Sequence, residues 1–88
     1  MGIREQIQEH YEESLLFADG FDDCVIGVTD DLGTVRVIYC IEKMIDSLMK
    51  DDSTTWQEAV EYLEFNTFGA YVGEQTPIYM EQAKCFTI

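Results

Sequence analysis

The chain has 88 residues, of which 18 are Asp or Glu and 5 are Lys or Arg, so its formal net charge at pH 7 is −13. It is 47% hydrophobic and 12% aromatic, which excludes a disordered acidic tail and fits one domain spanning residues 1–88. No run approaches the ~20 apolar residues that a membrane span needs, and the first residues lack the pattern of a signal peptide. We therefore expect a soluble, cytoplasmic protein.

The negative charge is concentrated in two segments. Residues 1–23 carry seven acids and one base, and residues 51–66 carry five acids and no base. Such a field repels nucleic acid and steers a protein towards basic surfaces. The charge pattern therefore predicts no direct contact with nucleic acid and a basic protein as partner.

Residues 3–18 have the spacing of an amphipathic helix. Apolar side chains recur every three or four residues along one stripe, made of Ile3, Ile7, Tyr11, Leu15 and Ala18. Gly20 follows as a stop signal. Residues 23–29 and 34–40 then predict two strands, because β-branched and aromatic residues dominate both. The connection between them predicts a tight hairpin with Gly33 in the left-handed conformation.

Two further helices are predicted after the hairpin. Residues 41–50 trace an amphipathic face, with Cys40 at the N-cap position. Thr55 followed three residues later by Glu58 is a capping box. It predicts a third helix from Trp56 to about Asn66, whose buried face consists of Trp56, Ala59, Val60 and Leu63.

The last part of the chain predicts a loop and one or two short strands. A loop covers residues 67–76, and Pro77 stands at the entry of a strand over residues 77–80, where no ladder donor is needed. Residues 83–88 predict an edge strand. The order is α-β-β-α-α-β, an α+β domain in which three helices pack on a small antiparallel sheet of three to four strands.

Catalytic and metal chemistry lack support in the residues. Cys24, Cys40 and Cys85 show no CxxC spacing, so we expect buried thiols, no metal site and no cofactor. A Cys24–Cys40 disulfide would be disfavoured in a reducing cytosol. The single His10 lies among glutamates and has no nucleophile placed for it by any specific pattern. We therefore expect a protein that is not an enzyme.

The segment from Glu64 to Ile78 is the most specific motif of the chain. Read as Glu-Phe-Asn-x-x-Gly-Ala-Tyr-Val-Gly-Glu-x-Thr-Pro-Ile, it resembles a segment in small proteins of unassigned function encoded mostly by tailed bacteriophages. The resemblance implies a phage origin and carries over no functional residues. A structural interpretation has Asn66 or Gly69 ending the helix and Gly73 taking a positive φ. In a functional interpretation the loop presents a polar rim to a ligand, made of Asn66, Tyr71, Glu74 and Thr76.

Two rows of glutamates are the other candidate binding residues. They lie three or four residues apart, so each row shares a helix face: Glu5, Glu9 and Glu12 on the first helix, and Glu58, Glu61 and Glu64 on the third. The chain is similar in size and charge to phage proteins that mimic DNA, although it has none of their motifs. The leading hypothesis is an acidic interaction protein that binds a basic host protein, such as a nucleic-acid-binding or defence protein. The alternatives are a small-molecule-binding module using loop 66–76 and a self-associating accessory protein.

Overall fold

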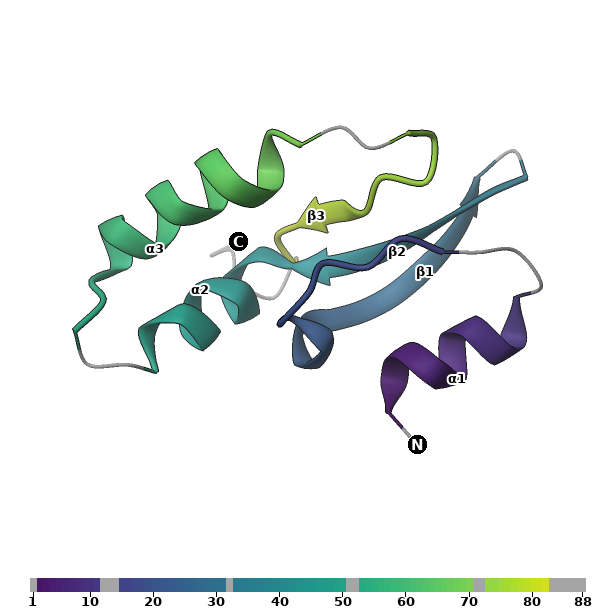
Figure 1. The fold of residues 1–88 in the computed structure, drawn as a ribbon, viewed down its shortest axis with the longest axis horizontal. Helices are drawn as coiled ribbons and strands as arrows, with labels where there is room; N and C mark the ends of the chain where they lie inside the picture. Colours follow the sequence, from purple (N-terminus) through teal and green to yellow (C-terminus); the bar gives the residue numbers. More distant parts are fainter. Residues whose placement is uncertain (1, 12–14, 32, 51–52, 71–72, 83–88) are drawn as a thin grey trace.

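The computed structural model describes residues 2–11, 15–31, 33–50, 53–70 and 73–82. The α+β class and the element order predicted from the sequence are confirmed (Figure 1). The expected strand over residues 83–88 lies outside the described residues. The elements are α1 (Ile3–His10), a 3₁₀ turn η1 (Asp22–Cys24), β1 (Val25–Asp31), β2 (Thr34–Cys40), α2 (Ile41–Met49), α3 (Trp56–Leu63), a π-helical turn η2 (Glu64–Phe68) and β3 (Ile78–Met80).

Strands β1 and β2 form the predicted hairpin. They pair antiparallel from Asp31 opposite Thr34 to Val25 opposite Tyr39, with a bulge between Val25 and Gly27. Gly33 has a φ of 83°, as the turn chemistry predicts. The hairpin begins two residues later than expected, because Asp23 and Cys24 belong to η1.

Strand β3 completes a mixed sheet with the order β1-β2-β3. It runs parallel to β2, with Ile38 opposite Ile78 and Cys40 opposite Met80, so the expectation of an antiparallel sheet is wrong for this strand. The reason lies in the connection. The chain leaves β2 into two helices and returns beside it, and such a helical crossover brings the second strand back in the same direction.

The predicted helix over residues 3–18 is wrong beyond its first half. Helix α1 ends at His10, and Tyr11 is extended, with φ −111° and ψ 135°. Residues 15–18 have no helical structure but still contribute to the core, where Leu15 is buried. Four of the five stripe residues pack in or against the core, whereas Ile3 is 39% exposed. The backbone reaches the core in two separate segments. Helical spacing in the sequence does not distinguish one continuous helix from a short helix followed by an irregular segment.

The core joins the sheet to all three helices, and residues 15–24 also contribute to it. Its centre combines alternate residues of β2 with one face of each helix, namely Val35, Val37, Tyr39, Met44, Ile45, Ala59 and Leu63. Trp56 was predicted to join this face but is 60% exposed. It is the first residue of α3, one turn before the buried Ala59, and so lies at the open end of the helix. Thr55 and Glu58 form the predicted capping box at the same end.

The π-helical turn η2 sets which aromatic side chains at the end of α3 are buried. Phe68 lies seven residues after Glu61 and four after Glu64, so a continuous α-helix would place it on the acidic side. A π turn contains one extra residue. It brings Phe68 round to the core side, where its ring centroid lies 4.9 Å from that of Tyr79. Gly69 then ends the helix, in agreement with one of the two predicted stops.

Candidate functional site

The structure divides the predicted acidic residues between two surfaces. Glu58, Glu61 and Glu64 are exposed on α3 and η2, whereas Glu5 and Glu9 are exposed on α1. Glu12 lies outside the described residues. Helices α1 and α3 lie towards opposite ends of the long axis of the molecule, which measures 40 Å (Figure 1). The two rows of glutamates are therefore separate surfaces.

Glu58 has a structural role at the start of α3. Its Oε1 accepts a hydrogen bond from the Thr55 backbone nitrogen at 3.1 Å, and the Thr55 hydroxyl accepts one from the Glu58 backbone nitrogen at 3.2 Å. The bond from the Thr55 backbone lowers the pKa of Glu58, because it favours the ionised carboxylate. Any substitution of Glu58 therefore changes the helix start as well as the surface charge. Glu61 Oε1 accepts a long hydrogen bond of 3.5 Å from Gln57 Nε2, so substitutions of Glu61 and Glu64 change mainly the surface charge.

The loop residues serve mainly to hold the loop in place. The Thr76 hydroxyl donates to the Gly73 carbonyl at 2.6 Å, and the Thr76 carbonyl accepts from Arg36 Nε at 2.7 Å. Gly73 has a φ of 113°, as predicted for this turn. Glu74 is exposed, and Tyr71 lies outside the described residues. These contacts favour a structural role for the Gly73–Thr76 part of the motif.

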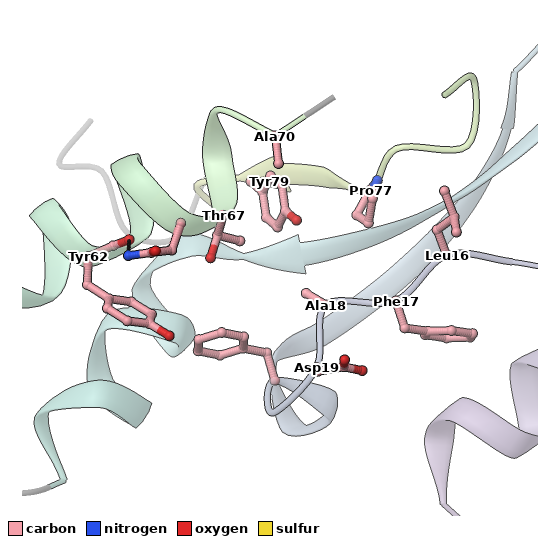
Figure 2. A pocket seen from close by; sticks show the side chains of 11 residues that line it. Leu16, Phe17, Ala18, Asp19, Tyr62, Thr67, Ala70, Pro77 and Tyr79 are labelled. Carbon is pink, nitrogen blue, oxygen red and sulfur yellow. Dashed lines mark hydrogen bonds between the residues drawn. The ribbon is translucent and has the colours of Figure 1, made fainter. Parts of the chain in front are cut away.

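Among the predicted loop residues, Asn66 lines a cavity. An open groove of about 380 Å³ lies between the segment before η1, the end of α3 and the entry to β3. Figure 2 shows Tyr62 reaching from α3 towards this segment and the Tyr79 ring projecting from β3. The residues that line the groove are Leu16, Phe17, Ala18, Asp19, Phe21, Tyr62, Asn66, Thr67, Ala70, Pro77 and Tyr79. Sequence reasoning missed the wall formed by residues 16–19, because it placed residues 16–18 in a helix.

The groove is mostly apolar and aromatic. Asn66 Nδ2 donates to the Tyr62 carbonyl at 3.0 Å, so one amide group of the wall is already bonded. Burial raises the pKa of the Tyr79 hydroxyl above its ordinary value. Asp19 is bonded to Arg4 at 3.3 Å, and the Arg4 guanidinium also lies 4.8 Å from the centre of the Phe17 ring. The groove thus offers walls for packing and few free polar groups for chemistry.

A second feature of α3 and η2 is a strip of exposed aromatic side chains. Phe65 is 86% exposed and Tyr62 is 50% exposed. They are three residues apart, and each follows a glutamate by four residues, so all four lie on one side of the helix. We call this surface the aromatic strip; it consists of Glu58, Glu61, Tyr62 and Phe65. A helical wheel of the sequence contains this signal, since Phe65 lies opposite the core residues Ala59 and Leu63.

No protein family, curated protein or solved structure matches this chain. Among the described helices, none is long and apolar enough to cross a membrane. Within the same part of the chain, His, Cys, Asp and Glu side chains form no group of three that could hold a metal ion. Cys24 and Cys40 are both buried and free, and the Cys40 thiol donates to Glu42 Oε2 at 3.3 Å.

Proposed function

We propose that the protein is a small, non-enzymatic interaction protein of phage type, which binds a basic host protein through the carboxylates of α3 and η2. The proposed target is a basic nucleic-acid-binding or defence protein. One observation carries the proposal. Residues 51–83 contain seven acidic and no basic side chains, and Glu58, Glu61 and Glu64 of this segment are exposed. A surface of one sign attracts a surface of the opposite sign and raises the association rate.

Helix α3 supports this role better than α1 does. Arg4 of α1 lies 2.9 Å from Asp22 and 3.3 Å from Asp19, so part of the acidic charge of the N-terminal region is neutralised within the molecule. His10 lies at the end of the same helix. The sequence of α3 and η2 contains no Lys, Arg or His at all. The stronger attraction for a basic partner is therefore on α3.

Affinity capture from bacterial lysate with the tagged protein tests the proposal. We expect a basic protein to be retained at low salt and released at high salt, because exposed charge pairs are screened. The double variant Glu61→Gln, Glu64→Gln should lose this protein. The matched control Glu5→Gln, Glu9→Gln removes the same charge from α1 and should retain it. A captured protein that resists salt, or equal losses in the two double variants, would contradict the proposal.

The groove supports a second candidate function, the binding of a small apolar or aromatic molecule. Its volume of about 380 Å³ and its aromatic walls are suited to such a ligand. A thermal-shift screen with metabolite and nucleotide panels tests it, since a ligand at ~100 times its dissociation constant stabilises the folded state by about 2.7 kcal/mol. Ala70→Leu, which adds bulk to the groove wall, should abolish a shift caused by a ligand in the groove. A shift that survives this variant places the ligand elsewhere.

A further inference from the structure

The aromatic strip leaves apolar surface in water that the described residues of the chain do not cover. Phe65 is 86% exposed, although the next aromatic residue of η2, Phe68, packs against the core. Burying an aromatic side chain is strongly favourable, and contiguous exposed apolar surface with a polar rim marks contact sites. Phe65 lies outside the core, and together with the half-exposed Tyr62 and the flanking glutamates it forms such a surface.

Tyr62 of the aromatic strip lines two separate hollows. One is the groove between α3, β3 and residues 16–19, to which Tyr62 contributes a wall (Figure 2). The other is an open hollow of about 440 Å³ between α2 and α3, lined by Leu48, Thr54, Glu58, Ala59 and Tyr62. The strip thus forms a ridge beside two hollows, and the ridges and grooves of a second helix can pack against such a surface. The surface is thus shaped for a rod-like partner with side chains on one face.

We propose that the aromatic strip docks a basic amphipathic helix of the partner protein. Apolar side chains of that helix pack against Phe65 and Tyr62 and enter the two hollows. Its Lys and Arg side chains face Glu61 of the strip and the neighbouring Glu64. This is the helix-in-groove mode of recognition. The inference rests on the proposed function and specifies the structural element that the partner presents.

The negative charge around the strip favours a basic helix over the other partners that an exposed apolar surface can bind. A second copy of the chain would bring Glu58, Glu61 and Glu64 against their own equivalents, and juxtaposed like charges oppose association. Nucleic acid and anionic lipid surfaces are repelled by the same carboxylates. An amphipathic helix with basic flanks satisfies both the aromatic and the acidic parts of the strip.

Calorimetric titration with a designed probe tests the proposal. The probe is a peptide of about 18 Leu and Lys residues, with Leu at the spacing of one helix face. Its isomer has the same composition in an order that gives no apolar face. We expect the amphipathic peptide to bind and Phe65→Ala to weaken it by about tenfold, as for a buried aromatic anchor. Phe65→Leu, which keeps apolar surface at this site, should restore part of the affinity.

Trp56→Ala is the matched control for Phe65→Ala. Trp56 is also an exposed aromatic residue of α3, 60% exposed, but it lies outside the aromatic strip at the helix start. Its removal should change the affinity by less than about twofold. In amide NMR spectra, the peptide should shift the signals of residues 58–66 more than those of α1. Both results support the proposed docking surface.

Two results would overturn the inference, and they differ in what they mean for the proposed function. Equal binding of the two peptide isomers, with no effect of Phe65→Ala, would show recognition by charge alone. The acidic interaction function would then stand and the helix-docking inference would fail. If neither peptide binds and no basic protein is captured from lysate, both fail.

Discussion

The phenolic oxygen of Tyr39 accepts a hydrogen bond from the backbone nitrogen of Ala18 at 2.7 Å. Tyr39 lies in the middle strand of the sheet and is fully buried, whereas Ala18 belongs to the irregular segment between α1 and η1. The bond therefore fixes this segment against the sheet. Residues 16–19 form one wall of the groove, so the same bond shapes the groove.

Tyr39→Phe should lower the free energy of unfolding by about 1–3 kcal/mol, because it leaves the partly buried Ala18 N–H without its acceptor. Urea denaturation monitored by circular dichroism measures the change. Tyr79→Phe is the matched control. Its ring lies 5.8 Å from that of Tyr39, and the described residues provide its hydroxyl with no hydrogen bond. A loss in the control equal to that in Tyr39→Phe would mean that the bond to Ala18 contributes little.

Stability should fall in alkaline solution. Burial raises the pKa of Tyr39 and Tyr79 above their ordinary value of 10.0 and that of Cys24 above 9.0. A group whose pKa is raised by folding contributes stability that is complete below the unfolded pKa and is lost as the pH rises through the folded pKa. We therefore expect the urea midpoint to hold up to about pH 8 and to fall above about pH 9 to 10. A midpoint that stays constant to about pH 11 would contradict this.

Gly33→Ala should destabilise the hairpin by about 1–2 kcal/mol, because the φ of 83° at this position is left-handed and costly for any side chain. A steric clash does not contribute to this loss, because a Cβ at Gly33 would meet no atom within 4 Å. Gly27→Ala is the control, because it has the same open surroundings without a left-handed φ. The midpoint of thermal unfolding should fall for Gly33→Ala only. Equal effects at both positions would rule out the backbone conformation as the cause.

Thr55→Ala should cost about 1 kcal/mol of stability, since it removes one acceptor of the capping box at the start of α3. Thr55→Ser keeps the hydroxyl and should cost little. Thermal unfolding checks both. Hydrogen exchange of the first turn of α3 should also speed up in Thr55→Ala, because the cap no longer holds this turn. The aromatic strip begins in the same turn, at Glu58. Unchanged exchange there would show that the helix start does not depend on the cap.

Added salt should stabilise the fold. The net charge of −13 makes the compact state repel itself. The screening length falls from about 30 Å at 0.01 M salt to about 10 Å at 0.1 M, which weakens this repulsion. We expect the thermal midpoint to rise over that range in NaCl. The ion pairs of Arg4 oppose this effect, and a falling midpoint would mean that they outweigh the general repulsion.

Local patterns predicted the elements whose causes are local. The hairpin with Gly33, the capping box at Thr55 and the apolar face of α2 each depend on residues within a few positions, and all three are present in the structure. The charge distribution is likewise a property of the sequence. These features need no knowledge of the rest of the fold.

Tertiary contacts decided the remaining features. The stripe from Ile3 to Ala18 has helical spacing, but Leu15 and Ala18 reach the core from an irregular segment that Tyr39 holds in place. The parallel pairing of β3 with β2 follows from where the two-helix crossover ends, which local pattern does not encode. Sequence periodicity reports which side chains are apolar. Which of them find partners, as Phe68 does and Phe65 does not, depends on the packing of distant segments and on the π turn between them.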